Sequence, residues 1–350
     1  MRYAVLTNGH PTSIEAEATA DGRLLASVAA PVLGWERAPH GWCRGDACVP
    51  AAAVAGIEED GRVDVLAFAE AQGGIAVADH DAGLLAVLPG EDRGPTAGTA
   101  PDAELADADG TPHRLSDYRG RKIALVMWAS WCGCRYDLPA WEQRHRELAD
   151  AGFTVISVAM DRSADDARPW IEQAGATHPA LIDTAGEVAA LYDIINVPTV
   201  VWIDEAGRIA RPQDSQVATD LFASMNGLSA EESLRALRRW VHEGDTGLSD
   251  EETRRRFRVP GRSEQEARGH ARIAVELYRR GDTEGAERHY RRAADLAPHD
   301  VTIRRGLMSL RGDDPFGDAY FALRDELAAA GIPIYRPLRP ADNASAAGEA

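Results

Sequence analysis

The middle of the chain alternates short apolar runs with longer amphipathic segments. Between residues 102 and 246 the apolar runs have the length of strands, and the amphipathic segments have the length of helices. Strands that alternate with helices are typical of an α/β sheet covered on its faces. The expected strands are 123–130, 153–160, 179–182, 199–204 and 208–210, and the expected helices are 135–149, 163–174, 187–193 and 233–244.

The two ends of the chain follow other patterns. Residues 1–90 hold short apolar runs in an Ala- and Gly-rich background, and they predict a small α+β domain. A polar linker follows at 91–101, and an all-helical pattern occupies 247–335. We therefore expect three domains, with one boundary at the linker, a second near residue 246, and a polar tail at 336–350.

The segment 267–300 resembles one tetratricopeptide repeat. Small residues recur at the crossing points of two expected helices, and Pro298 follows the second helix. Such repeats are stabilised by stacking on neighbours, so we expect the helices at 249–258, 301–311 and 316–330 to cover it, or the repeat to dock on the α/β domain. The resemblance implies a protein partner on this all-α, TPR-like module.

Charge and composition narrow the function classes. The chain carries 38 basic and 56 acidic residues, a formal charge of −18, which argues against nucleic acid as a partner. The first twenty residues lack the apolar run of a secretory signal, and no stretch approaches the roughly twenty apolar residues of a membrane span. We expect a cytoplasmic protein with no membrane partner.

The strongest chemical signal is the motif WASWCGCR at 128–135, where an expected strand ends and an expected helix begins. A thiol at such a junction meets free backbone N–H groups and the positive end of the helix dipole, and both lower its pKa. Cys132 is therefore expected to be an exposed, nucleophilic thiolate, with Cys134 as its neighbour.

This motif resembles the thioredoxin superfamily, and within it the TlpA-like redoxin branch of bacterial thiol-disulfide oxidoreductases. The resemblance covers about 101–246. It includes the opening segment GTPHRLSDYRG at 110–120, a helix-kinking Pro139 five residues after Cys134, and Asn196-Val197-Pro198-Thr199 in the place of the cis-proline loop. The family has a thioredoxin-like fold, which the α/β pattern of this part agrees with.

The resemblance also implies residue roles. Cys132 would be the nucleophile and Cys134 the resolving thiol. The substrate chain would lie against Trp131, Gly133, Val197 and Pro198, which follow from the matching positions of the motif and the loop. It further implies a protein disulfide or thiol as substrate, a separate reducing partner, and neither a cofactor nor a metal.

Two departures from the family pattern change the expected chemistry. Only Gly133 separates the two cysteines, where the family has two residues, and a bridge across so short a spacing should be strained and easily reduced. Such a pair favours oxidase or isomerase chemistry; without a bridge, Cys132 would act alone or through a sulfenic acid. Val126 stands where many thioredoxins bury an acid that deprotonates the second cysteine, so no general base is identified. Asp137 and Glu142 are candidates by proximity alone, and both are expected on solvated helix positions.

Several alternatives remain open for the Cys132/Cys134 pair. A thiol peroxidase with an antioxidant role shares this fold, although its Pro-x-x-x-Thr-x-x-Cys motif is absent. A redox sensor or scaffold without turnover is a second alternative, which the deleted residue supports. Two weaker alternatives are a pair of inert buried thiols and a zinc site completed by Cys43 and Cys48. The zinc site is disfavoured because Cys-x-Cys lacks the usual spacing of zinc ligands.

A second cysteine pair lies in GWCRGDACVP at 41–50. Gly45-Asp46 predicts a tight turn that would bring Cys43 and Cys48 together. The pair is either a hairpin disulfide, a second redox pair that exchanges electrons with Cys132 and Cys134, or two unpaired thiols.

Overall fold

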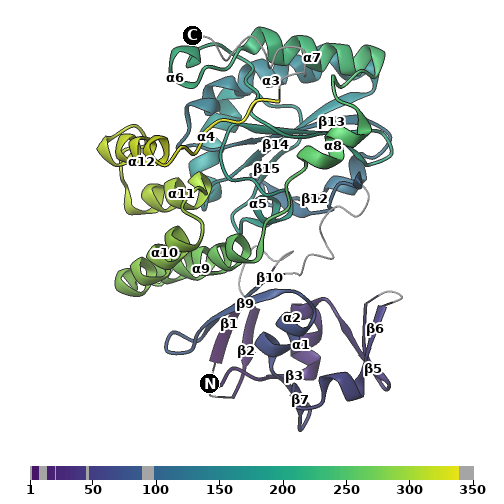
Figure 1. Cartoon of the computed structure of the whole chain (residues 1–350), viewed down its shortest axis with the longest axis vertical. Helices are drawn as coiled ribbons and strands as arrows, with labels where there is room; N and C mark the ends of the chain where they lie inside the picture. The colour runs from purple at the N-terminus through teal and green to yellow at the C-terminus, as the bar shows by residue number, and fades with distance from the viewer. Residues whose placement is uncertain (1, 8–13, 20, 45–46, 89–97, 339–350) are drawn as a thin grey trace. The chain divides into compact units, whose positions relative to one another are not determined.

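The computed structural model describes residues 2–7, 14–19, 21–44, 47–88 and 98–338 (Figure 1). The chain forms two compact units, and each is discontinuous in sequence. The first unit comprises Met1–Gly94 and Pro260–Pro298, and the second comprises Pro95–Val259 and His299–Ala350. The helical segment expected as one module at 247–335 is therefore divided between the units, which differs from the three consecutive domains expected. The linker expected at 91–101 lies mostly outside the described residues.

The second unit is built on a seven-stranded sheet. In spatial order its strands are β12 (Pro112–Arg114), β11 (Glu104–Asp107), β15 (Ala180–Ile182), β14 (Phe153–Ala159), β13 (Lys122–Trp128), β16 (Thr199–Ile203) and β17 (Ile209–Asp214). The neighbours β13 and β14 run parallel, as do β14 and β15, and the remaining pairs are antiparallel. The central strands are almost wholly buried, which explains their continuous apolar sequences.

Helices cover both faces of this sheet. Successive side chains of a strand point to opposite faces of the sheet, so Leu125 and Val126 of β13 lie on its two faces. Val126 packs in a cluster with Trp141 of α3 (Leu138–Leu148) and Trp240 of α7 (Ala230–Glu243), whereas Leu125 belongs to the cluster that contains Val188 of α5 (Glu187–Leu191). The α/β arrangement expected from the hydrophobic pattern is confirmed.

The remaining helices of the second unit come mainly from the C-terminal part of the chain. They are α4 (Ala164–Ala174), α6 (Ala223–Asn226), α8 (Asp250–Arg256), α11 (Val301–Arg311) and α12 (Asp318–Ala329). After α12 the chain continues along the end of β17, where the Leu338 amide donates to Asp214 over 2.7 Å and the Arg336 amide donates to Ser215 Oγ over 2.8 Å. Arg336–Leu338 are therefore part of the fold rather than of a tail, and the rest of the expected tail lies outside the described residues.

The first unit is a small α+β domain, as expected for residues 1–90. Its main sheet has the order β2 (Ile14–Glu17), β1 (Arg2–Thr7), β10 (Leu84–Leu88) and β9 (Ile75–Asp79), and it is accompanied by α1 (Ala26–Leu33) and α2 (Val65–Ala71). Two small three-stranded sheets complete it. One has the order β3 (Leu24–Leu25), β8 (Arg62–Val63) and β7 (Glu58–Glu59), and the other has the order β4 (Glu36–Ala38), β5 (Gly41–Arg44) and β6 (Ala47–Pro50).

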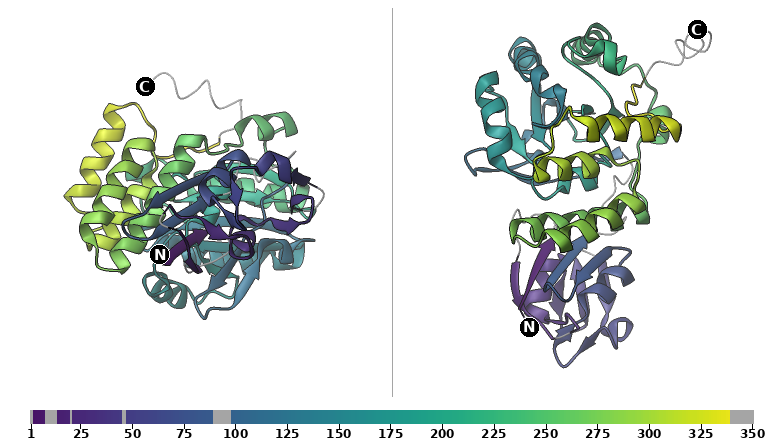
Figure 2. Two further views of the ribbon diagram at one scale, coloured as in Figure 1. Left: turned by 90° about the horizontal axis from the view of Figure 1, so that it is seen from below. Right: turned by 90° about the vertical axis from the view of Figure 1, so that its left-hand side faces the viewer.

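The helix pair α9 (Arg262–Arg279) and α10 (Thr283–Leu296) also belongs to the first unit (Figure 2). Helix α9 packs on β9 and β10, and α10 packs on α9. The contact is close at Gly269, where an added Cβ would come within 2.7 Å of Val77 Cγ2. Stacked helical repeats bury their apolar faces on one another, whereas this single pair is covered by a sheet. A TPR-like module is therefore not established, and the protein partner expected on it stays a prediction.

Most expected elements of the second unit lie within a few residues of their predicted bounds. Ser229 caps α7 by accepting from the Glu232 amide over 3.3 Å, and α11 begins and ends at the residues predicted. Pro139 differs from expectation, because α3 begins at Leu138 and the proline occupies the first helical turn, where its missing N–H costs no hydrogen bond. In the described part of the chain, no helix has both the length and the apolar character needed to cross a bilayer.

Candidate active site

Cys132 lies just beyond the end of β13. It begins a 3₁₀ turn, Gly133–Asp137, that leads directly into α3, and its sulfur accepts a hydrogen bond from the Cys134 amide over 3.3 Å. Its thiol also faces the carbonyl oxygen of Val197 at 3.6 Å, in the loop where the Val197-Pro198 peptide bond is cis. The structure thus brings the cysteine motif and the expected cis-proline loop together, although 65 positions separate Cys132 from Val197.

Both cysteines are buried. Cys132 is 4% exposed and Cys134 is 7% exposed, so the expectation of an exposed nucleophile is wrong. A small pocket holds the two cysteines together with Pro198 and side chains from later parts of the chain. We call five of these the covering residues: Phe222, Arg305, Phe316, Tyr320 and Tyr335. All but Phe222 lie beyond residue 246, outside the thioredoxin-like domain expected from the sequence, so no motif of that domain indicates them.

Arg305 of α11 is a buried member of the covering residues. Its Nη2 donates to the carbonyl oxygens of Trp131 at 2.5 Å and Pro315 at 2.7 Å. Its guanidinium carbon lies 3.9 Å from the ring centroid of Tyr320 and 4.9 Å from that of Trp131. A buried guanidinium is therefore held against the residue that immediately precedes Cys132.

This environment separates the two thiols electrostatically. Burial opposes ionisation of Cys132, but the hydrogen bond with Cys134 and the positive charge of Arg305 outweigh it, and the pKa of Cys132 is lowered. Burial, reinforced by the hydrogen bond and negative charge of Cys132, raises the pKa of Cys134 well above its ordinary value. Of the two thiols, Cys132 is thus the more easily ionised. Neither is bridged in the structure.

Asp137 is the carboxyl group that lines the pocket with the cysteines. It is buried, accepts from the Ala218 amide over 3.1 Å, and accepts from the hydroxyl of Thr219. Burial raises the pKa of Asp137, and its charge opposes ionisation of both cysteines. The expectation that it is solvated is wrong, because the segment after β17 folds over the start of α3 and supplies its partners.

Glu142 is also buried rather than solvated, but it serves a different network. Its carboxylate accepts from the amide and hydroxyl of Thr177, at 2.9 and 2.7 Å, and lies 2.8 Å from His178 Nδ1. Although burial opposes ionisation, these hydrogen bonds lower the pKa of Glu142 to about 2. It is therefore a structural anion that ties α3 to the segment before β15.

The replacement Glu142→Gln is expected to reduce the free energy of unfolding at pH 7 by about 1–3 kcal/mol, because the charge-assisted hydrogen bonds are weakened. The folded-state pKa lies below the unfolded value of about 4.3, so this stabilisation is present above that value and is lost as the pH falls towards 2. Urea unfolding of both proteins across pH 2–7 checks this. A destabilisation that stays constant over the range would contradict it.

The four expected substrate-binding residues have different surroundings. Gly133 and Pro198 line the pocket with the cysteines. Gly133 has no room for a side chain, since an added Cβ would meet the Phe222 ring at 2.6 Å. Trp131 is buried beneath Arg305, and Val197 meets Cys132 through its carbonyl oxygen. Access to Trp131 and Val197 would therefore require the covering residues to move.

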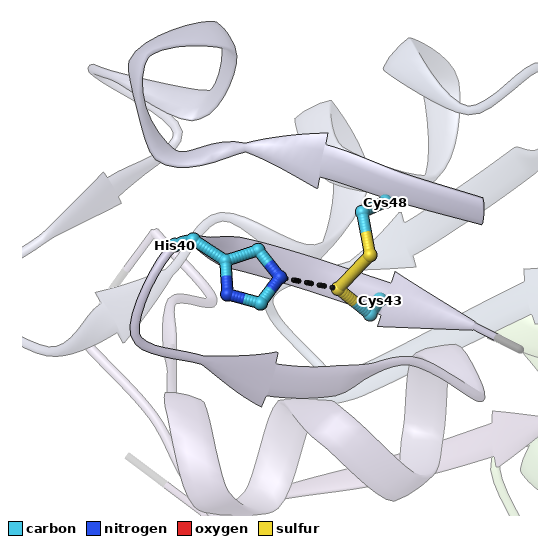
Figure 3. A group of neighbouring side chains, drawn as sticks. All are labelled: His40, Cys43 and Cys48. Atoms are coloured by element: carbon cyan, nitrogen blue, oxygen red, sulfur yellow. Dashed lines mark hydrogen bonds between the residues drawn. A yellow bond between two sulfur atoms is a disulfide. The ribbon is translucent and has the colours of Figure 1, made fainter. Parts of the chain in front are cut away.

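The second cysteine pair forms a disulfide on the hairpin β5–β6 of the first unit (Figure 3). The reading of Cys43 and Cys48 as unpaired thiols is therefore not borne out. The turn expected at Gly45-Asp46 lies outside the described residues.

Comparison with known proteins identifies relatives of the second unit. The model of the AhpC/TSA family matches residues 97–211. The thioredoxin-like protein YneN of Bacillus subtilis is 36% identical over 123 residues, which cover 34% of this chain and 70% of that protein. The thiol-disulfide oxidoreductase ResA of Geobacillus thermodenitrificans is 31% identical over 114 residues, 32% of this chain and 66% of that protein, so the chain spans just under two thirds of its length.

Among solved structures, the exposed lipoprotein thioredoxin of Streptococcus pneumoniae is 28% identical, with 39% of this chain and 98% of that chain covered and a TM-score of 0.33. Both cysteines of the motif, Asp137 and Pro198 fall inside the family match, whereas all five covering residues fall outside it.

Proposed function

Because this chain belongs, through residues 97–211, to the thioredoxin-like redoxin family that includes thiol-disulfide oxidoreductases, we propose that it exchanges thiols and disulfides through Cys132 and Cys134. The observation that supports the proposal most is the pocket that holds Cys132 and Cys134 beside the cis Val197-Pro198 loop, and the opposite directions of the two pKa shifts agree with it. A nucleophile must be ionised, whereas a resolving thiol holds its proton until the first bond has formed.

In the first step the thiolate of Cys132 attacks one sulfur of a substrate disulfide. The substrate S–S bond breaks, the departing sulfur takes up a proton, and a mixed disulfide with Cys132 remains. Cys134 then loses its proton and attacks the Cys132 sulfur, which releases the second substrate thiol. The pair ends as a disulfide, and two electrons have passed to the substrate. Asp137 is placed to take the Cys134 proton, since it lines the same pocket and burial raises its pKa.

The covering residues control access to this chemistry. A protein disulfide can reach the Cys132 sulfur only when side chains such as Phe222 and Tyr335 move aside, because both cysteines are more than nine-tenths buried. Substrate binding and displacement of the cover are therefore coupled in the proposed reaction.

Removing one covering ring should uncover the nucleophile. The replacement Phe222→Ala is expected to raise the rate at which iodoacetamide alkylates Cys132 in the native protein by about tenfold. This corresponds to a decrease of about 1.4 kcal/mol in the free energy needed to uncover the Cys132 thiol. Phe321→Ala is the matched control, because Phe321 of α12 is 42% exposed and does not line the pocket. Equal alkylation rates in the two variants would show that Phe222 does not limit access.

The proposed function is tested by mass-shift alkylation. Reduced and oxidised forms of the full chain are alkylated, digested and mapped, and a bridge between Cys132 and Cys134 is expected to form on oxidation and to open with a dithiol. If no such bridge forms under any condition in which the protein transfers electrons, the two-cysteine reaction is wrong. This measurement also tests whether a Cys-x-Cys pair can close its ring.

The closed pocket favours a second candidate function, the reduction of a small hydroperoxide. Such a molecule is far smaller than a protein disulfide, so it needs less displacement of the cover. The thiolate of Cys132 would attack the O–O bond, which gives a sulfenic acid and an alcohol or water, and Cys134 would displace water to form the disulfide. Peroxide consumption without protein disulfide reductase activity would favour this candidate over the first.

A further inference from the structure

The hairpin β5–β6 of the first unit carries a partly exposed disulfide. Cys43 and Cys48 are directly opposite one another in the register of the two strands. Cys48 is an exposed residue and Cys43 is half-buried, so Cys48 is the cysteine that is more open to solvent. This hairpin lies outside the range of the family match, and the reaction proposed for Cys132 and Cys134 does not use it.

A histidine approaches one of the two sulfurs. His40, in the turn before β5, places its Nε2 at 3.2 Å from Cys43 Sγ, as the dashed line in Figure 3 shows. All three side chains bring their ligand or reactive atoms within 4.8 Å of one another. An imidazole at this distance can donate a hydrogen bond to Cys43 when the disulfide is intact, and it can stabilise a thiolate there once the bond is broken.

We propose that His40, Cys43 and Cys48 form a second thiol-disulfide exchange site, in which a reducing thiol attacks Cys48 and Cys43 is the leaving group. The more exposed cysteine is the one that an incoming thiolate reaches more easily, and the sulfur of the departing cysteine lies 3.2 Å from the His40 ring nitrogen. Because a better-stabilised leaving thiolate departs faster, the position of His40 gives the reaction a direction.

The electrons and atoms balance with a thiol as the reductant. A first thiolate attacks Cys48 Sγ, the Cys43–Cys48 bond breaks, and Cys43 leaves as a thiolate beside His40. A second thiol, on the same molecule or on another, attacks the reductant's sulfur in the mixed disulfide and releases Cys48. The reductant is oxidised to its disulfide, and two electrons and two protons reside on the cysteine pair.

A purely structural role explains these observations less well. The strands already pair through four residues on each side, and the disulfide closes a sequence separation of only 5. A cross-link over so short a loop restricts the unfolded chain less than one over a long loop. Exposed disulfides are also the class that is reduced most readily.

The experiment uses the full chain with Cys132→Ser and Cys134→Ser, so that only the hairpin cysteines remain and the result does not depend on the function proposed above. The protein is treated with reduced glutathione, quenched with acid, and mapped by mass spectrometry. Glutathione is expected on Cys48 rather than on Cys43. The same peptides are mapped in the wild-type chain, which keeps the test valid if the double variant does not fold.

A second comparison tests the histidine. His40→Asn is expected to slow reduction of the bridge about fivefold, the effect of losing one hydrogen bond to the leaving sulfur. His242→Asn is the control, because His242 is an exposed residue of α7 in the other unit. Equal reduction rates in the two variants would overturn the role of His40.

Three further outcomes would overturn the proposal in whole or in its direction. Reduction only after denaturation would make the bridge a structural cross-link. Glutathione found mainly on Cys43 would reverse the proposed direction. Retention of one equivalent of Zn²⁺ by the reduced protein, with reoxidation blocked until a chelator is added, would show that the three side chains form a metal site instead.

Discussion

The replacement Cys132→Ser is expected to lower the rate of protein disulfide reduction by the full chain by at least about a thousandfold, the usual scale for loss of a nucleophile. A serine hydroxyl stays protonated in the same pocket, so no anion is available to attack the substrate. Turnover is measured as insulin reduction with a dithiol as the regenerating reductant, after subtraction of the rate without protein.

Cys134→Ser provides the informative partner variant. The first step still occurs, but no thiol resolves the mixed disulfide, so a covalent adduct between Cys132 and the substrate should accumulate and be visible by mass. If Cys132→Ser retains the wild-type rate, Cys132 is not the nucleophile. If Cys134→Ser turns over at the wild-type rate without an adduct, the resolving role of Cys134 is wrong.

The second large effect concerns Arg305. Arg305→Gln is expected to raise the pKa of Cys132 and to slow its alkylation at neutral pH by about tenfold, because the nearby positive charge is lost. The same variant should lose about 1–3 kcal/mol of unfolding free energy, because the carbonyl oxygens of Trp131 and Pro315 lose a buried donor. The pH profile of alkylation and urea unfolding measure the two effects separately.

Arg305→Lys separates charge from structure. A lysine keeps the positive charge but not the planar fork, so the pKa of Cys132 should stay low while part of the stability is lost. Arg304→Gln is the control, because the neighbouring Arg304 pairs with Glu326, which is itself largely exposed. If Arg305→Lys and Arg305→Gln shift the pH profile equally, Arg305 acts on Cys132 by packing and not by its charge.

Much of the second unit could be predicted from sequence because its signals are local. Continuous apolar runs mark β13 and β14 as buried strands, Ser229 marks the start of α7, and the loop at Val197-Pro198 follows from its resemblance to a known motif. Each of these features depends on a few adjacent residues. For Cys43 and Cys48 the motif leaves three alternatives open, because a sequence separation of 5 permits a bridge without requiring one.

The positions of the covering residues around Cys132 could not be predicted in the same way. The bond from Arg305 to Trp131 joins residues 174 positions apart, and neither neighbourhood carries a pattern that specifies the other. Asp137 illustrates the same limit, since its burial is decided by Ala218 and Thr219, far along the chain. For α9 and α10, the amphipathic pattern shows that one face is covered but does not show whether a helix or a sheet covers it.

The discontinuous second unit has a consequence for the protein while it is being synthesised. The cysteine motif emerges roughly two hundred residues before Tyr335, which at the usual rate of translation is a delay of about 10–40 seconds. During that interval Cys132 has neither Arg305 beside it nor Tyr335 over it. The nascent chain therefore presents uncovered thiols, without the Arg305 charge that lowers the pKa of Cys132 and without the burial that raises the pKa of Cys134, and the mature site exists only after the chain through Tyr335 has left the ribosome.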